Sequence, residues 1–444
     1  MTAFRFVHAA DLHLGSPFKG LAHGPTALYH RLRRAPLLAF ERLVDVCCRQ
    51  KVDFVCLCGD LYELEEGRLE GPLALQKGLW RLHDAGIQTF LIRGNHDPDD
   101  ARQPRLEWPS TAHWFSSRQV EAVPFYKKGK EVARLYGFSY PTAEFRDNVV
   151  EQFRRDTHGP FAIALHHTNV DGIGGHENYA PSRLADLLAT GIDYWALGHV
   201  HRRQVLHESP WVVYPGNLQG RHMRESGEKG AYLVEVDDGV VRQLTFVPLS
   251  PVIWHSQTVD ITGVSREEEL LTRLREALQT LRAGLTRSTP SARPASEDAT
   301  AVVRFVLVGT TELAPRLQRS GVLDDVAARL NEEMGWDEPT DDATVQAGAV
   351  WVADVANRTW PPFDVAVYPL LQDSVARLRR WRAGLGIDVP AEGCAPVQEW
   401  LTSLWNHPTA RQYLDPWTGD DWDAMLEEAE SLLVTLAAAS RERP

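Results

Sequence analysis

The chain has 444 residues, of which 43% are hydrophobic and 24% charged, and its formal net charge at pH 7 is −13. These fractions are typical of globular proteins and exclude a disordered, collagen-like or coiled-coil chain as a description of the whole. The sequence contains no uninterrupted apolar stretch of ~18 residues, so no membrane-spanning helix is predicted.

The first 250 residues alternate short apolar runs with helical patterns. Strands are predicted at Phe4 to Ala9, Phe54 to Cys58, Thr89 to Ile92, Phe161 to Leu165, Tyr194 to Leu197, Trp211 to Tyr214 and Ala231 to Val236. Helices are predicted at Leu28 to Cys48 and Leu73 to Ala85. This alternation predicts a layered α/β domain over residues 1–250.

A small α+β module is predicted over residues 251–360. Its strands are expected at Val259 to Thr262, Val302 to Val308 and Thr344 to Val355, and its helices at Arg266 to Leu281 and Val322 to Met334. Residues 361–444 follow as a helical tail that ends in an amphipathic helix at 421–439. That helix is interpreted as packing on its own domain or as binding a partner.

The charge of the chain is divided unevenly. Residues 1–250 hold 29 Lys and Arg against 30 Asp and Glu, whereas residues 251–444 hold 18 against 30. The five cysteines suit reduced thiols, and Cys56 and Cys58, which alternate in an apolar run, are interpreted as small core residues. Because the chain opens on a strand pattern, we expect no signal peptide and a cytoplasmic location.

Five polar clusters follow five of the predicted strands. They are Asp11-Leu12-His13, Gly59-Asp60, Gly94-Asn95-His96-Asp97, His166-His167 and Gly198-His199-Val200-His201. Ligands of open α/β sheets bind at the carboxyl ends of strands, so these clusters are expected to converge. Carboxylate, imidazole and amide oxygen suit Mn²⁺, Fe²⁺ or Zn²⁺, and the number of candidate ligands predicts two ions with a bridging carboxylate.

This ordered series resembles the calcineurin-like metallophosphoesterase superfamily. The segments Phe6 to Gly15 and Tyr214 to Asn217, with Gly220-Arg221 and Gly227 to Gly230, are similar to the SbcD and YhaO group of DNA repair exonucleases. The resemblance implies a four-layer α/β/β/α sandwich and two divalent metal ions, for which we expect Mn²⁺. It assigns Asp11, His13, Asp60 and His201 to the first metal and Asp60, Asn95, His167 and His199 to the second.

The resemblance also implies that His96 is the general acid and that Asp97 orients it. Successive residues of a strand face opposite ways, so only one residue of the doublet His166-His167 can join the cluster, and we prefer His167. Glu63 is interpreted either as a group behind the metal ligands or as a helix-start carboxylate. Arg93 and Arg221 are candidates for substrate phosphates, and each is equally able to pair with a local carboxylate.

The metal residues alone predict phosphoester hydrolysis. The resemblance favours a DNA exonuclease, with endonuclease activity as a further expectation, that works in DNA repair with an SbcC-like or YhaN-like coiled-coil ATPase. A homodimer is also considered. The alternatives are a metallophosphatase or nucleotide phosphodiesterase of the same superfamily, and a scaffold for the ATPase whose site is vestigial.

Overall fold

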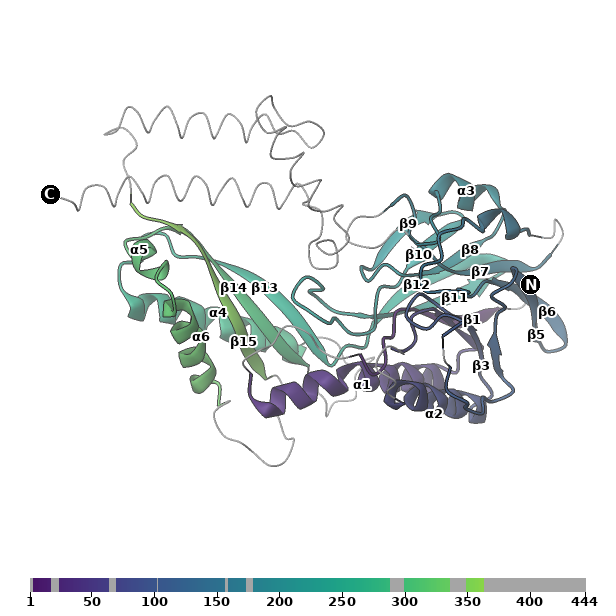
Figure 1. Ribbon diagram of the computed structural model, residues 1–444, viewed down its shortest axis with the longest axis horizontal. Helices are drawn as coiled ribbons and strands as arrows, with labels where there is room; N and C mark the ends of the chain where they lie inside the picture. The colour runs from purple at the N-terminus through teal and green to yellow at the C-terminus, as the bar shows by residue number, and fades with distance from the viewer. Residues whose placement is uncertain are drawn as a thin grey trace, which may run out of the picture. The chain divides into compact units, whose positions relative to one another are not determined.

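The computed structural model describes residues 3–16, 24–63, 69–101, 103–155, 159–172, 179–287, 299–335 and 349–362. Its N-terminal part contains two six-stranded sheets (Figure 1). The first consists of β1 (Phe4–Ala9), β2 (Phe54–Cys58), β3 (Gln88–Ile92), β4 (Ala112–Trp114), β11 (Gly230–Asp237) and β12 (Val240–Pro248). The strand order is β12-β11-β1-β2-β3-β4; β1 to β4 are parallel, and β11 runs antiparallel to both β1 and β12.

The second sheet has the order β5-β6-β7-β8-β10-β9. Its strands are β5 (Glu121–Lys127), β6 (Lys130–Gly137), β7 (Phe161–His167), β8 (Tyr194–Gly198), β9 (Gln204–Glu208) and β10 (Trp211–Tyr214). The four central strands are parallel, and the two edge strands are antiparallel to their neighbours. Both sheets therefore direct the carboxyl ends of their parallel strands to one edge, as the polar clusters require.

The core lies in three layers because alternate side chains of a strand face opposite ways. Phe54, Cys56 and Cys58 of β2 pack between the two sheets, whereas Val55 and Leu57 pack beneath the helices. The helices on that face are α1 (Thr26–Gln50) and α2 (Glu70–Asp84). The four cysteines of the described residues, Cys47, Cys48, Cys56 and Cys58, are free thiols.

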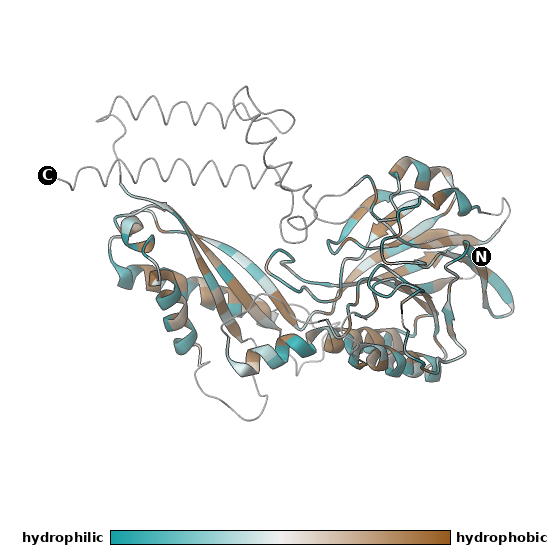
Figure 2. Ribbon diagram, viewed as in Figure 1, coloured by the Kyte–Doolittle hydropathy of each residue, from teal (hydrophilic) through white to brown (hydrophobic). Residues whose placement is uncertain are grey.

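The outer face of the second sheet is covered by α3 (Leu184–Ala189) and the 3₁₀ turn η1 (Val150–Gln152). Trp195 of β8 is fully buried in this layer, against Phe153 and Leu187. Figure 2 shows hydrophobic residues along the strands of both sheets and along α1 and α2. The predicted α/β/β/α sandwich is therefore confirmed.

A third, three-stranded parallel sheet consists of β13 (Val252–Asp260), β14 (Thr300–Thr310) and β15 (Val350–Trp360), in that order. Its helices are α4 (Glu267–Arg287), α5 (Ala314–Leu317) and α6 (Val322–Glu333). β13 starts at Val252, seven residues before the predicted start. The reason is that the Gln219 side chain bonds the N–H and C=O of Val252, while the Trp254 indole donates to Gly220 O.

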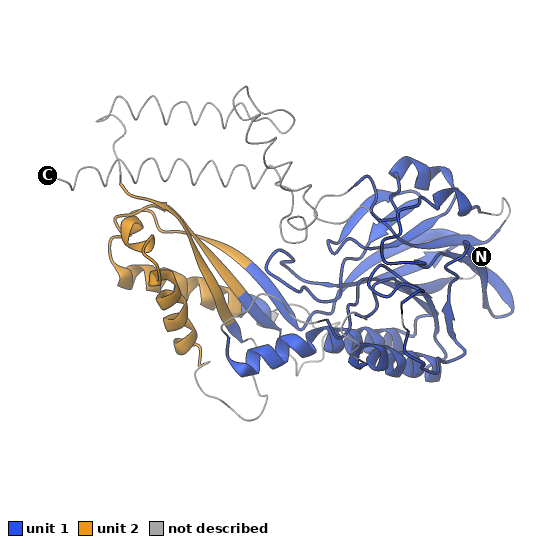
Figure 3. Cartoon of the chain, viewed as in Figure 1, with its two compact units in different colours: residues 1–255, 283–302, 337–350 blue, residues 256–282, 303–336, 351–444 orange. Residues whose placement is uncertain are grey.

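The chain divides into two compact units (Figure 3). The first contains residues 1–255, 283–302 and 337–350, and the second contains residues 256–282, 303–336 and 351–444. The tail predicted at 361–444, except its first two residues, lies outside the described residues, as does its helix at 421–439. Within the described part of the chain, no helix is both long and apolar enough to cross a membrane.

Candidate metal centre

The site forms where the chain leaves the ends of β1, β2, β3, β7 and β8. Four of its residues have left-handed backbone conformations, which non-glycine residues rarely adopt. They are Asp11 (φ 51°), His13 (43°), Asp60 (51°) and His199 (95°). The segment after β1 runs beside the segment after β2, because Asp11 N–H donates to Gly59 O at 3.1 Å and His13 N–H donates to Asp60 O at 3.0 Å. Such strain is typical of functional sites held by the surrounding fold.

Glycines allow these segments to approach one another closely. A Cβ atom at Gly94 would overlap Asp60 Oδ1 and would lie 2.9 Å from His167 Cε1. A Cβ atom at Gly198 would overlap the carbonyl of Cys58 and would lie 2.8 Å from His167 Nδ1. Only glycine therefore fits at these two positions without moving side chains of the site.

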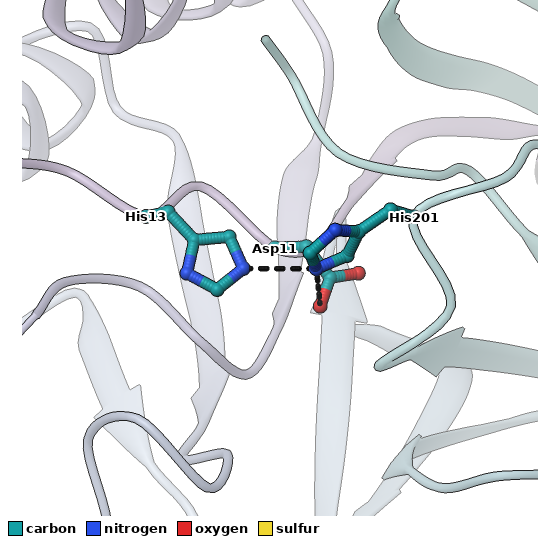
Figure 4. Close-up of side chains that lie close together, drawn as sticks. All are labelled: Asp11, His13 and His201. Atoms are coloured by element: carbon teal, nitrogen blue, oxygen red, sulfur yellow. Dashed lines mark hydrogen bonds and ion pairs between the residues drawn. The ribbon is translucent and has the colours of Figure 1, made fainter. Parts of the chain in front are cut away.

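Two imidazoles face each other at one side of the site (Figure 4). The Nε2 atoms of His13 and His201 are 3.0 Å apart, and Asp11 Oδ1 lies 4.0 Å from His201 Nε2. The opposite nitrogen of each ring meets a carboxylate: His13 Nδ1 lies 2.9 Å from Glu63, and His201 Nδ1 lies 2.6 Å from Glu225. A carboxylate on one ring nitrogen is the usual support of a histidine that binds metal through the other.

These rings fit a cation. When each Nδ1–H donates to its carboxylate, both Nε2 atoms carry lone pairs, and the two lone pairs repel each other unless a positive charge lies between or beside them. Burial, reinforced by the charge of Arg221, lowers the pKa of both His13 and His201 against the opposing glutamates. The rings are thus neutral, which is the form that binds metal.

A second group of side chains surrounds Asp60. Its Oδ2 lies 3.4 Å from His167 Nε2 and 3.8 Å from His13 Nε2. Asn95 Oδ1 lies 3.1 Å from His167 Nε2 and 3.3 Å from His199 Nδ1. In each of three sets of residues, the ligand atoms lie within 4.8 Å of one another. The sets are Asp11, His13 and His201; His13, Asp60 and His96; and Asp11, Asp60 and His167. The structure therefore brings all seven predicted metal residues together, and their donors suit a dinuclear site.

The pKa values of the two buried aspartates are shifted in opposite directions. Burial raises the pKa of Asp11 to about 7; the charge of His167 opposes this shift and that of Asp60 adds to it. Burial also opposes ionisation of Asp60, but His167, His96 and His13 outweigh burial and hold the pKa of Asp60 well below its usual range. Divalent cations would offset the cost of keeping two carboxylates in this buried space.

His96 is the most exposed ring of the cluster, with 29% of its side chain accessible, against 2% for His13 and 0% for His167. Its Nδ1 lies 2.7 Å from Glu63 Oε2, and its Nε2 lies 3.9 Å from Asp60 Oδ2. Burial opposes protonation, but Asp60 and Glu63 together raise the pKa of His96 to about 9. A protonated, accessible imidazole suits a general acid.

The prediction that Asp97 orients His96 is wrong. The Asp97 carboxylate accepts from the backbone N–H groups of Gly94 at 2.8 Å and Leu61 at 3.3 Å, and it is fully buried. Asp97 thus ties the segments after β2 and β3 together, while Glu63 holds the His96 ring. The helix-start interpretation of Glu63 fails as well, because α2 begins seven residues later.

The doublet after β7 divides as strand geometry requires. His167 donates from Nδ1 to Cys58 O at 2.9 Å and directs Nε2 at the cluster. His166 points the other way, with its ring 5.3 Å from that of Phe153 and 6.4 Å from that of Trp195.

The two candidate arginines differ in position. Arg93 lies over the Trp114 ring, 4.4 Å from its centroid, with Nη1 3.3 Å from Tyr62 Oη and Nε 3.6 Å from Asp99. Arg93 therefore pairs with the neighbouring side chains of Tyr62 and Asp99. Arg221 lies at the cluster itself.

Sequence reasoning missed one residue of the site, Glu225. It lies outside the five clusters and reaches His201 through the loop between β10 and β11. The available signal was its position between Gly220-Arg221 and Gly227 to Gly230, two motifs that carry the resemblance.

Comparisons with known proteins agree with this geometry. Residues 4–203 match the family model of calcineurin-like phosphoesterases, and residues 254–359 match the middle domain of the metallophosphoesterase YhaO. The uncharacterized metallophosphoesterase YhaO of Bacillus subtilis is 32% identical over 434 residues, which cover 98% of each chain. The DNA double-strand break repair protein Mre11 of Methanopyrus kandleri is 27% identical, over 61% of this chain and 62% of its own.

A component of a bacterial nuclease is also similar. The SbcD component of the nuclease SbcCD from Staphylococcus epidermidis is 22% identical, over 56% of this chain and 70% of its own. Mre11 and the SbcD component match only part of the chain, whereas YhaO matches nearly all of it. The chain therefore belongs to the calcineurin-like metallophosphoesterases and, within them, to the YhaO type.

Proposed function

We propose that this metallophosphoesterase is a two-metal phosphodiesterase that cleaves DNA, chiefly as an exonuclease and also as an endonuclease. The observation that carries the proposal is the arrangement of His96: a partly exposed ring, held by Glu63, beside a buried set of metal-binding side chains. The similarity to proteins named for DNA break repair and nuclease activity supports DNA as the substrate.

The proposed metal ligands are shared between two ions. Asp11, His13, Asp60 and His201 would hold the first, and Asp60, Asn95, His167 and His199 the second, with Asp60 as the bridge. Two bound divalent cations, for which we propose Mn²⁺, would activate water and neutralise charge on the phosphodiester. The left-handed conformations of Asp11, His13, Asp60 and His199 keep the ligands preorganised, so little reorganisation is required on binding.

His96 would protonate the oxygen of the leaving nucleotide. Glu63 accepts from its Nδ1, which leaves Nε2 as the atom that donates the proton. The backbone N–H of His96 donates to Asp60 Oδ1 at 2.9 Å, so the proton donor is fixed relative to the proposed bridging ligand.

A substrate with a good leaving group tests this role. We expect Mn²⁺-dependent degradation of end-labelled linear DNA by the wild-type chain, and its loss in both His96→Ala and Asp60→Ala variants. Bis-p-nitrophenyl phosphate releases a phenolate that departs without protonation, so His96→Ala should retain much of this activity while Asp60→Ala loses it. The exposed His30 on α1 supplies a matched control, His30→Ala, with wild-type rates.

Other outcomes would favour a different function. Hydrolysis of the monoester p-nitrophenyl phosphate without DNA cleavage would indicate a metallophosphatase. DNA cleavage that survives equally in Asp60→Ala would indicate a contaminant, and no hydrolysis of any phosphoester would indicate a vestigial scaffold.

The charge of the chain supports a partner. Phosphate contacts with cationic groups supply most non-specific affinity for DNA, yet residues 251–444 carry 12 more acidic than basic residues. We propose that a coiled-coil ATPase of the SbcC or YhaN kind supplies cationic surface, and that the helix predicted at 421–439 contributes to its binding. Deleting residues 415–444 should abolish co-purification with the ATPase and leave Mn²⁺-dependent phosphodiesterase activity intact; retained binding would contradict the proposal.

A further inference from the structure

Arg221 contacts both carboxylates that support the facing imidazoles. Its Nη1 lies 3.2 Å from Glu63 Oε1 and 3.4 Å from Ser16 Oγ, while its backbone N–H donates to Glu225 Oε2 at 2.6 Å. Glu63 and Glu225 belong to different loops, separated by 162 positions in the sequence. Arg221 therefore links the carboxylate behind His13 to the carboxylate behind His201.

Both carboxylate oxygens of Glu225 have hydrogen-bond partners. It is 9% exposed. Its Oε1 lies 2.6 Å from His201 Nδ1, and its Oε2 accepts from Asn217 Nδ2 at 2.9 Å and from the backbone N–H of Arg221. The Lys229 ammonium donates to the carbonyl of His201 at 2.9 Å. The loop between β10 and β11 thus holds His201 by its ring and by its backbone.

We infer that Arg221 and Glu225 form a positioning unit, which sets the tautomers and the separation of His13 and His201 and thereby the affinity of one of the two metal sites. A carboxylate on Nδ1 fixes the tautomer and makes the metal-binding nitrogen more basic. A buried carboxylate is costly without a cationic or N–H partner, and Arg221 supplies one to each carboxylate. Arg221 thus acts through the imidazoles, which favours the carboxylate pairing over the substrate contact, the two alternatives that the sequence left open.

This inference rests on the metal centre of the proposed function, but it does not depend on DNA being the substrate. Metal binding measures it directly. Metal-free protein, prepared with EDTA and then desalted, is titrated with Mn²⁺ by calorimetry, and the free ion is counted by its electron paramagnetic resonance signal. The wild-type chain should bind two Mn²⁺ ions.

The variants should differ in how much they weaken Mn²⁺ binding. Glu225→Ala should weaken one of the two sites by about 10–100-fold. Glu225→Gln should weaken it less than Glu225→Ala, because an amide oxygen still accepts from His201 Nδ1, even though the amide NH2 then faces the donors Asn217 Nδ2 and Arg221 N–H. Arg221→Ala should also weaken it less than Glu225→Ala, because the backbone N–H of residue 221 still reaches Glu225. Glu228→Gln and Arg224→Gln, in the same loop, are the matched controls and should bind Mn²⁺ as the wild type does.

Kinetics separate positioning from substrate binding. At saturating Mn²⁺, Arg221→Ala should have a wild-type KM for DNA, whereas an arginine that binds phosphate would show a raised KM with unchanged Mn²⁺ affinity. A raised KM with unchanged Mn²⁺ affinity in Arg221→Ala, or wild-type Mn²⁺ affinity in Glu225→Ala, would overturn this inference and leave the proposed function standing. A wild-type chain that binds no Mn²⁺ would contradict the proposed function as well. Circular dichroism of the metal-free variants, with Glu225→Gln as the conservative change, verifies that they are folded.

Discussion

His166 and His167 are neighbours in β7 whose rings lie in opposite environments. His167 donates to Cys58 O and joins the metal-binding cluster. His166 is fully buried beside Phe153 and Trp195, and within the described residues neither of its ring nitrogens has a hydrogen-bond partner. Burial lowers the pKa of His166 to about 3, and the charge of His167 adds to this shift. One ring is therefore a ligand candidate, and the other is a polar group in an apolar layer.

Replacing each histidine by phenylalanine separates these roles. His166→Phe should raise the free energy of unfolding by about 1 kcal/mol, because it removes a buried polar group without a partner, and should leave Mn²⁺ binding unchanged. His167→Phe should abolish binding of one Mn²⁺ ion. Chemical denaturation and calorimetric titration measure the two effects. Loss of metal in His166→Phe would show that the doublet has been assigned the wrong way round.

Asp60 should couple metal binding to stability. In the wild-type chain, Mn²⁺ at about 100 times its dissociation constant should raise the free energy of unfolding by about 2.7 kcal/mol for each site. Asp60→Asn should lose most of this increase, since Asp60 Oδ2 lies within 4 Å of the Nε2 atoms of His13, His96 and His167. Thermal unfolding with Mn²⁺ and with EDTA measures the difference. An Mn²⁺-induced rise of wild-type size in Asp60→Asn would contradict the bridging role.

Gly94 should tolerate no side chain. Gly94→Ala places a methyl group against Asp60 Oδ1 and His167 Cε1, so we expect a loss of about 1–3 kcal/mol in stability together with weakened Mn²⁺ binding. Gly284 on α4 is the matched control: an added Cβ meets no atom within 4 Å, and Gly284→Ala should stabilise the helix by up to ~1 kcal/mol. Calorimetric unfolding of both variants gives the comparison, and equal stabilities would contradict the close approach at Gly94.

Local patterns account for much of the fold and of the metal-binding cluster. Six of the eight parallel strands in the two six-stranded sheets were predicted, because runs such as Phe54 to Cys58 are apolar on both faces; β4 and β6 were not predicted. Asp60 and Asn95 were predictable because polar residues that follow such runs meet at one edge of the sheets. Edge strands such as β5 (Glu121–Lys127) were not predicted, because their exposed faces carry polar residues and dilute the apolar signal.

The support of the ligands depends on contacts between loops. Glu225 and His201 are 24 positions apart, and nothing in the spacing of either residue indicates that their side chains meet. Asp97 follows His96 in the sequence, yet its carboxylate turns to the backbone of Gly94 and Leu61 while Glu63 reaches the His96 ring. The His96 ring is therefore held by Glu63, 33 positions away, and not by its sequence neighbour Asp97. Only the three-dimensional structure shows this.

Glu63 should set the pH dependence of cleavage. The general acid must be protonated, so the rate falls as the pH rises through the pKa of His96, which Asp60 and Glu63 hold above its usual value against the effect of burial. Glu63→Gln removes one of these charges and places an amide between the N–H groups of His13 and His96. The alkaline limb of kcat should therefore move to lower pH.

The rate at the optimum should also fall in Glu63→Gln, by about 10–100-fold, because the support of both rings is disturbed. Rates of DNA cleavage measured across pH at saturating Mn²⁺ give both effects. Glu228→Gln, an exposed glutamate outside the cluster, should keep the wild-type profile. An alkaline limb that stays in place in Glu63→Gln would mean that another group donates the proton, since the only charge removed from beside His96 would then have had no influence on the acid.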